Sequence, residues 1–231
     1  MEKNRSYGLS SWDEATVTAG NFKTDLPKFE YMRLKDGNNS VRIVTAPYRY
    51  FMVRYKAAND KGFGKRVNTA WPLHEDCPAK AAGLKPKERY LVGVIDREDQ
   101  KLKVLDMSIL VYEQVQGLKN DIEWGSPAGY DINIRKNSKA KAPAGFYNVL
   151  PRSKAALSPA DEALLEAKEG LEKYLVSRTT PPKPEFVRKR MEELGWDGSQ
   201  VTVQAEAEDA ELSTADDTAY EFKRPSQAAQ A

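Results

Sequence analysis

The most regular pattern along the chain is an alternation of apolar and polar positions, which is typical of β-strands. It is clearest in YDINIRK, where Tyr130, Ile132 and Ile134 fall on one face and polar residues on the other. Six further segments predict strands in the same way: 41–46, 48–56, 65–71, 88–99, 101–108 and 146–151. The polar turn at 96–100 predicts that two of these strands form a hairpin.

Helical spacing replaces this alternation in three places. Segment 109–118 predicts a short helix between two strands. Ser158 and Pro159 are typical of a helix start, because serine caps the first turn and proline suits the first helical position. Segment 185–194 predicts a last helix that ends at Gly195.

Short strands without a βαβ rhythm predict a mainly β fold with added helices, specifically a five-stranded OB-type barrel. The composition changes along the chain and predicts four parts. These are an N-terminal arm (1–27), the OB core (28–155), a helical extension (156–197) and an acidic disordered tail (198–231).

Charge is distributed unevenly between the two ends of the chain. Residues 1–154 hold 27 Lys+Arg and 18 Asp+Glu, whereas residues 155–231 hold 9 and 16. A basic body with an acidic tail predicts a body that meets a polyanion and a tail that competes with it, or a tail that only solubilises. The tail acids are Glu206, Glu208, Asp209, Glu211, Asp216, Asp217 and Glu221.

Three features that the sequence lacks indicate where in the cell the protein is expected. The chain has one cysteine, Cys77, so it holds no internal disulfide framework. Residues 1–12 lack the apolar centre of a signal peptide, and no apolar run approaches the roughly 18–20 residues of a membrane span. We therefore expect a soluble, cytoplasmic protein that contacts no membrane.

The stretch at 47–67 combines five aromatic residues with six lysines or arginines. In an extended strand Tyr48 and Tyr50 share a face with Arg54, where rings can stack on bases and cations can neutralise phosphates. Stacking needs unpaired bases, so the pattern favours single strands. An ordinary strand with a tyrosine-rich solvent face is the alternative.

Two neighbouring segments, NDKGFGKR and RKNSKAKAPAG, add basic clusters and favour nucleic-acid binding. The stacking candidates are Tyr48, Tyr50 and Phe63. The phosphate-contact candidates are Arg54, Lys56, Lys61, Lys65, Arg66, Arg135, Lys136, Lys139 and Lys141.

Catalysis and metal binding receive little support from the sequence. His74 and Cys77 are spaced like half of a zinc site, but zinc needs about four ligands and the chain has one residue of each type. Asp96, Asp99 and Asp106 could imitate a metal-dependent nuclease, although hairpin turns collect aspartate for conformational reasons. We expect a protein without cofactor, metal or enzymatic activity.

Three segments carry a resemblance to a known family: WPLHEDCPA, ERYLVGVIDREDQKLKVLDMSILVYEQV and EWGSPAGYDINIRKNSKAKAPAGFYNVLPR. Together they resemble the core of bacteriophage single-stranded DNA-binding proteins, the helix-destabilising replication proteins of tailed phages. The resemblance spans roughly residues 25–155. It implies an OB-fold that coats unpaired DNA without strong sequence preference in the host cytoplasm.

The resemblance also implies that the acidic tail contacts a polymerase, helicase or primase and competes for the DNA groove. Some members of that family hold zinc through one His and three Cys, of which this chain lacks two thiols, so no metal is carried over. Self-association stays open, as does an RNA-binding or annealing protein of the same fold.

Overall fold

The structure is a computed structural model, and it describes residues 8–9, 26–55, 64–70, 75–142 and 145–198. The strands are β1 (Gly8–Leu9), β2 (Tyr31–Met32), β3 (Gly37–Ile43), β4 (Tyr48–Tyr55), β5 (Lys65–Asn68), β6 (Lys87–Asp96), β7 (Lys101–Ser108), β8 (Tyr130–Lys136) and β9 (Tyr147–Lys154). The helices are α1 (Pro78–Ala81), α2 (Ile109–Asn120), the 3-10 turn η1 (Pro127–Gly129), α3 (Pro159–Leu165), α4 (Lys168–Thr179) and α5 (Pro184–Glu193).

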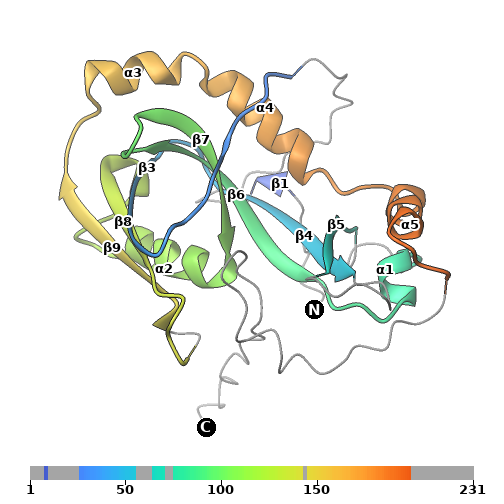
Figure 1. Ribbon diagram of the computed structural model, residues 1–231. Helices are drawn as coiled ribbons and strands as arrows, with labels where there is room; N and C mark the ends of the chain where they lie inside the picture. The colour runs from blue at the N-terminus through green and yellow to red at the C-terminus, as the bar shows by residue number, and fades with distance from the viewer. Residues whose placement is uncertain (1–7, 10–25, 56–63, 71–74, 143–144, 199–231) are drawn as a thin grey trace, which may run out of the picture.

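Strand β6 is the centre of one curved sheet (Figure 1). Along one edge it pairs with β7 over its length, from Arg89 opposite Ser108 to Asp96 opposite Lys101. Its other edge is shared, because β4 pairs with its first half and β3 with its second half. The sheet continues from β3 to β8 and then to β9, with antiparallel pairing throughout this path.

The expected hairpin, the interposed helix and the final helix are confirmed by β6–β7, α2 and α5. Ser158 caps α3 as expected, since its hydroxyl accepts a hydrogen bond from the Asp161 backbone N–H at 3.1 Å. The stretch that follows forms two helices, α3 and α4. The secondary structure is therefore mixed, with β-strands and added helices.

The expectation of a closed five-stranded barrel is not met by the described residues, which form an open nine-stranded sheet. Closure would require β9 to pair with the free edge of β7. The middle of that edge is occupied by β2, which runs parallel to β7 with Tyr31 opposite Val104 and Met32 opposite Leu105. On β9, the side chain of Gln114 bonds the backbone instead, accepting from Val149 N–H at 2.9 Å and donating to the Tyr147 carbonyl at 3.1 Å.

Apolar side chains pack on both faces of the sheet. On the inner face Val92, Val94 and Ile132 pack against Val111 and Val115 of α2. On the outer face β4, β6 and β7 pack under Leu171 and Leu175 of α4. A third cluster joins the end of β4 to α1 and α5. Helices therefore cover parts of both faces, and these parts cannot meet a ligand directly.

Candidate nucleic-acid interface

The two tyrosines expected to stack on bases are buried. Tyr48 and Tyr50 each expose 5% of their surface and pack under Leu171 and Leu175 of α4. Burial, together with the charge of Glu172, raises the pKa of Tyr48 to about 12. The expectation that Tyr48 and Tyr50 form an exposed stacking face is therefore wrong. The alternation correctly places them on one face, but a helix more than 100 residues further along the chain covers that face.

The hydroxyl of Tyr50 instead belongs to a charged network at the edge of α4. It donates to Asp106 at 3.0 Å and accepts from Arg66 at 2.6 Å. Asp106 also accepts from Arg66 at 2.6 Å and from the buried Arg89 at 3.0 Å. Burial opposes ionisation of Asp106, but the charges of Arg89 and Arg66 outweigh it and lower the pKa of the carboxyl. The network is thus ionised, with two cations for one anion.

Three of the expected phosphate contacts gather where β4 pairs with β5. Arg66 lies opposite Arg54 in the antiparallel register, and Lys65 opposite Tyr55. Lys65 is exposed, and the Arg66 side chain reaches solvent with 33% of its surface. Arg54 is half-buried and donates to the Gly64 carbonyl at 3.2 Å. This end of the sheet therefore presents positive charge to solvent.

A second group of expected contacts follows β8. Arg135, Lys139 and Lys141 are exposed. Lys136 is a correction, because it exposes only 8% of its surface and its ammonium points to the Leu34 carbonyl at 3.5 Å. The period of two along β8 explains this, since Lys136 shares the inward face of Ile132 and Ile134.

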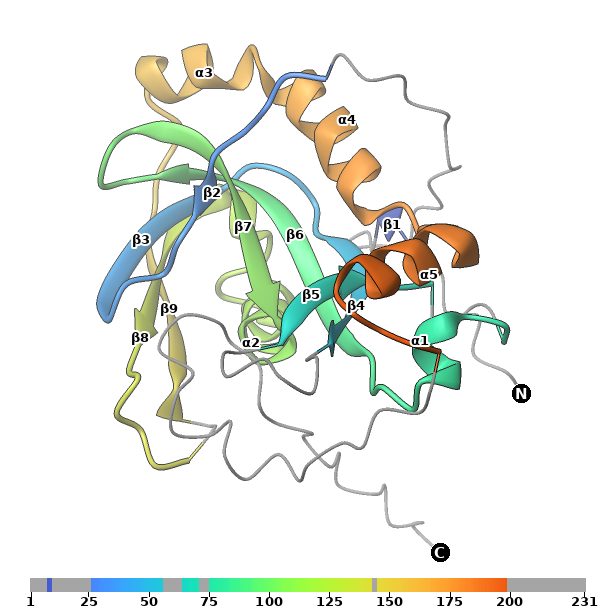
Figure 2. The ribbon, with the colours of Figure 1, turned by 45° about the vertical axis from the view of Figure 1, so that its right-hand side comes forward.

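Figure 2 shows how these groups relate. In this view β5 lies to the right of the end of β7, and β8 and β9 lie to its left. The segment after β2 runs beside this connection, as the hydrogen bond from Ser138 to Asp36 confirms. The exposed cations at β5 and those after β8 therefore lie on opposite sides of β7 in this view.

Sequence reasoning missed three further exposed residues that could contact DNA. Tyr31 and Arg33 are exposed on and after β2, and Arg178 is exposed in the last turn of α4. A signal for the first two exists in YMRLK, where Tyr31, Arg33 and Lys35 alternate with Met32 and Leu34. Lys35 is exposed but paired with Glu98 at 2.6 Å.

Several expected residues lie outside the described part of the chain. These are Lys56, Lys61, Phe63, His74 and the seven acids of the tail. Cys77 is described, and it is fully buried with its Sγ 3.0 Å from the hydroxyl of Thr69.

The carboxylates of the nuclease alternative are engaged by cations. Asp96 and Asp99 both bind the ammonium of Lys103, at 2.9 and 2.6 Å. Burial alone would lower the pKa of Lys103, but these two carboxylates raise it. Asp106 lies towards the other end of β7, bound to arginines. Within the described ranges, no three His, Cys, Asp or Glu side chains are placed to hold a metal ion.

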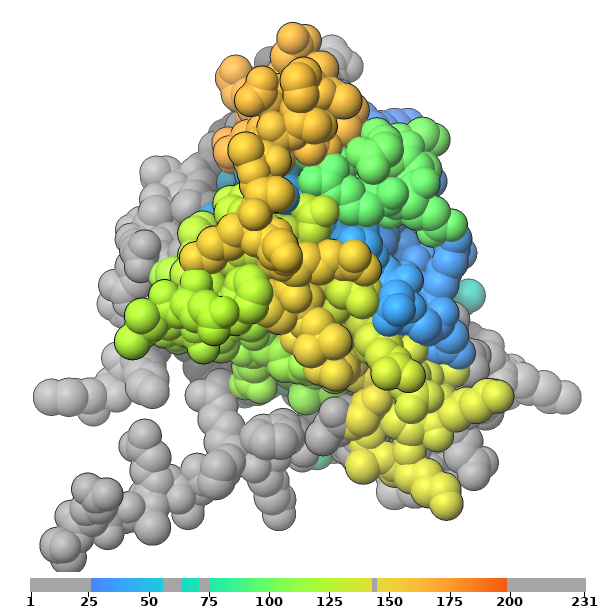
Figure 3. Space-filling view, turned by 90° about the vertical axis from the view of Figure 1, so that its left-hand side faces the viewer, coloured from blue at the N-terminus to red at the C-terminus, as the bar shows by residue number. Residues whose placement is uncertain are grey.

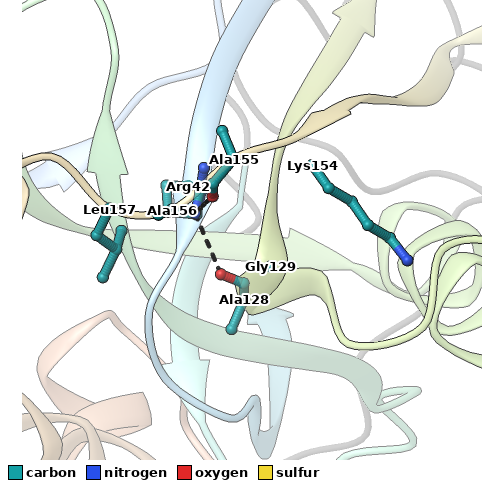
Figure 4. Close-up of a pocket in the computed structure, with 7 residues that line it drawn as sticks. All are labelled: Arg42, Ala128, Gly129, Lys154, Ala155, Ala156 and Leu157. Carbon is teal, nitrogen blue, oxygen red and sulfur yellow. Dashed lines mark hydrogen bonds between the residues drawn. The ribbon is translucent and has the colours of Figure 1, made fainter.

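A hollow beside η1 is also built around a cation, Arg42 (Figure 4). Its guanidinium is 2% exposed and donates to the carbonyls of Ala128 at 3.3 Å and Ala155 at 3.1 Å. It also binds the Asp131 carboxylate at 2.7 Å. Arg42 therefore ties β3, η1 and the end of β9 together.

Comparison with known proteins gives one informative match. The chain is 28% identical over 149 residues to the probable ssDNA-binding protein of Escherichia phage T5. The match covers 56% of this chain and 56% of that relative, so the chain spans little more than half of the relative's length. No family model and no solved structure matches. The resemblance to phage single-stranded DNA-binding proteins is confirmed by this match.

A search for membrane spans among the described helices found none of sufficient length and apolarity to cross a bilayer.

Proposed function

We propose that this protein binds single-stranded DNA and performs no covalent chemistry. The observation that carries the proposal is the similarity to a probable ssDNA-binding protein over 149 residues. The exposed cations on β5, after β2 and after β8 support it, because phosphate neutralisation supplies much of the affinity for nucleic acids.

The DNA strand in this proposal follows the exposed cations of β5, of the segment after β2 and of the segment after β8. Lys65 and Arg66 on β5, Arg33 after β2, and Lys139 and Lys141 after β8 would contact phosphates. The unpaired bases of a single strand can contact side chains between these cations. The bases of a duplex are stacked and paired, so a duplex would offer mainly its phosphates. We infer that β3 with β4, then β6, β7, β8 and β9, form a partly open OB-type core with α2 inserted.

The decisive experiment is a titration of labelled oligo-dT, matched duplex DNA and matched RNA at two salt concentrations. We expect the DNA single strand to bind tightest, with log affinity falling against log salt at a slope near about −3.5 if about five phosphates are neutralised. Equal affinity for the duplex would contradict single-strand binding. Tighter binding of RNA would favour the RNA-binding alternative.

Substitution of one cation localises the contact. Arg33→Gln should weaken oligo-dT binding about two- to fivefold and make the salt slope less negative by about 0.7. Lys173→Gln is the control, because Lys173 is an exposed cation on α4 that is already paired with Glu169. An equal effect of both substitutions would show that the proposed path is wrong.

The acidic tail has a separate role in the proposal. It would compete with DNA for the cationic face and contact replication proteins. Truncation after about residue 200 should tighten oligo-dT binding, most at low salt, because ions screen an electrostatic competitor. Unchanged affinity at low salt would leave only a solubilising role.

Incubation of the protein with labelled DNA and magnesium tests the non-catalytic part of the proposal. We expect the substrate to stay intact, because Asp96, Asp99 and Asp106 are each neutralised by lysine or arginine. Cleavage that disappears in an Asp99→Asn variant would establish the nuclease alternative instead.

A further inference from the structure

The burial of Tyr48 and Tyr50 leaves the outer face without the rings expected there, and Tyr31 is the aromatic residue that takes their place at its surface. Tyr31 exposes 37% of its surface on β2. In the parallel register it lies opposite Val104 of β7. Val104 belongs to the cluster under α4, and the Tyr31 side chain contacts Arg178 and Tyr174 of that helix, so Tyr31 borders the face that α4 partly covers.

The polar end of Tyr31 is held by α4. Its hydroxyl is hydrogen-bonded to the guanidinium of Arg178 and lies beside Tyr174. Arg178 in turn sits over the Tyr174 ring, with the guanidinium carbon 5.8 Å from the ring centroid. The Tyr174 ring packs at 5.7 Å from the ring of Phe29. The orientation of the Tyr31 ring is therefore fixed by side chains that pack on one another.

Positive charge surrounds this ring. Arg178 is exposed, and its charge is stabilised by nearby Tyr31, Tyr174 and Tyr50. Tyr50 is the residue whose hydroxyl holds Arg66. The end of α4 is also joined to β5, because the Asn68 amide donates to the Arg178 carbonyl at 3.4 Å. Two guanidinium groups, from β5 and α4, thus reach solvent near one exposed phenol ring.

The Tyr31 ring is neutral at physiological pH. Burial of its hydroxyl raises the pKa, and the hydrogen bond from Arg178 opposes this only in part. A neutral phenol beside a guanidinium presents an uncharged π-face for stacking and a cation for the adjoining phosphate.

We propose that Tyr31, positioned by Arg178, is a stacking site for one unpaired nucleobase on the outer face of the sheet. This inference rests on the proposed single-stranded DNA binding and adds a base contact to it. It assigns part of the binding surface to β2 and α4, which lie outside the strands of the OB-type core. The helix that buries Tyr48 and Tyr50 thereby contributes to a ligand site at its other edge.

Oligo-dT titrations of two variants at this position test the inference. Tyr31→Leu should weaken binding about tenfold, because loss of base–aromatic stacking has effects of this order. The salt slope should stay unchanged, since no phosphate contact is lost. Tyr31→Phe keeps the ring but loses the hydrogen bond to Arg178, so its affinity should lie between those of the wild type and Tyr31→Leu. Phe186→Leu is the control, because Phe186 is 65% exposed on α5.

A photochemical experiment on the unsubstituted protein gives an independent answer. Oligonucleotides carrying 5-iodouracil should crosslink to Tyr31, and peptide mass spectrometry would identify the site. Full binding by Tyr31→Leu, or crosslinks confined to other residues while wild-type protein binds oligo-dT, would overturn the inference and leave the proposed function intact. Absence of oligo-dT binding by the wild-type protein would overturn both.

Discussion

The outer face of the sheet has two halves, of which helix α4 covers one and leaves the other exposed. The covered half consists of β4, β6 and β7, whose outward residues include Tyr48, Leu91 and Val104 under α4. The bare half consists of β3, β8 and β9, whose outward residues include Asn133, Arg135 and Leu150. Figure 3 shows β9 in the middle of the bare half, with none of the described helices in front of it.

Both halves alternate with the same period of two, so the difference lies in which residues face outward. Burial of rings and aliphatic side chains under a helix lowers the free energy of the folded state, whereas burial of an unpaired charge raises it. A strand face that carries Tyr48, Tyr50 and Met52 therefore indicates a packing partner. A face that carries Arg135 indicates exposure and is better placed to contact a phosphate.

The joint between the halves is a network of ion pairs. Arg97 follows β6 and binds Asp131 of β8 at 3.0 Å and Asp161 of α3 at 2.5 Å. Asp131 also binds Arg42 of β3 at 2.7 Å. Through Arg97 the helical segment that leads into α4 is attached to the bare half.

The largest expected difference between the halves is in packing. Leu171→Ala should lower the free energy of unfolding by about 3 kcal/mol, because Leu171 is fully buried against the covered half. Urea denaturation measures the change. Leu150→Ala is the matched control on the bare half, where 47% of Leu150 is exposed. We expect this control to change stability by no more than about 0.5 kcal/mol, and equal losses would contradict the distinction.

The joint should respond to acid. The hydrogen bond from Arg97 lowers the pKa of Asp161 to about 2, although burial opposes this. A carboxyl with a lowered folded-state pKa stabilises above its unfolded pKa, near about 3.9, and loses that contribution as pH falls towards 2. The free energy of unfolding should thus fall by about 2 kcal/mol between these values.

Asp161→Asn provides the comparison for this pH effect. The amide keeps the shape of the side chain but not its charge, so the variant should be less stable at pH 6 and should lose less stability on acidification. Parallel pH profiles of wild type and variant in urea would show that Asp161 contributes nothing to acid sensitivity.

Removal of the Tyr50 hydroxyl tests whether this residue of the covered half stabilises the fold or binds DNA. Tyr50→Phe removes the hydrogen bonds to Asp106 and Arg66, and we expect a loss of about 1 kcal/mol in unfolding free energy. Oligo-dT affinity should stay within about twofold of wild type. A large loss of affinity without a change in stability would restore Tyr50 to the binding site.

A substitution on the bare half should have the smallest effect on stability, but it should measurably weaken DNA binding. Lys139→Gln should weaken oligo-dT binding about threefold and make the salt slope less negative by about 0.7, with stability within about 0.5 kcal/mol. The control is Lys189→Gln, an exposed lysine on α5. A salt slope unaltered by Lys139→Gln would remove this residue from the proposed DNA path.

Local sequence patterns were sufficient for most elements and for several of the exposed cations. The period of two located β6, β7 and β8, and the capping serine located the start of α3, because these signals depend on neighbouring residues. The same period could have excluded Lys136 from the predicted phosphate contacts, because Lys136 shares the buried face of Ile134. Arg135, Lys139 and Lys141 were expected to be exposed and are exposed.

Long-range packing decided the rest. Tyr48 and Tyr50 are buried because α4 returns across β4, and β2 pairs with the middle of β7 on the edge that β9 would need for closure. Both events join segments that lie far apart along the chain, so alternation within either segment carries no information about them. An alternating strand specifies two faces, and the element that arrives from elsewhere determines which face meets water.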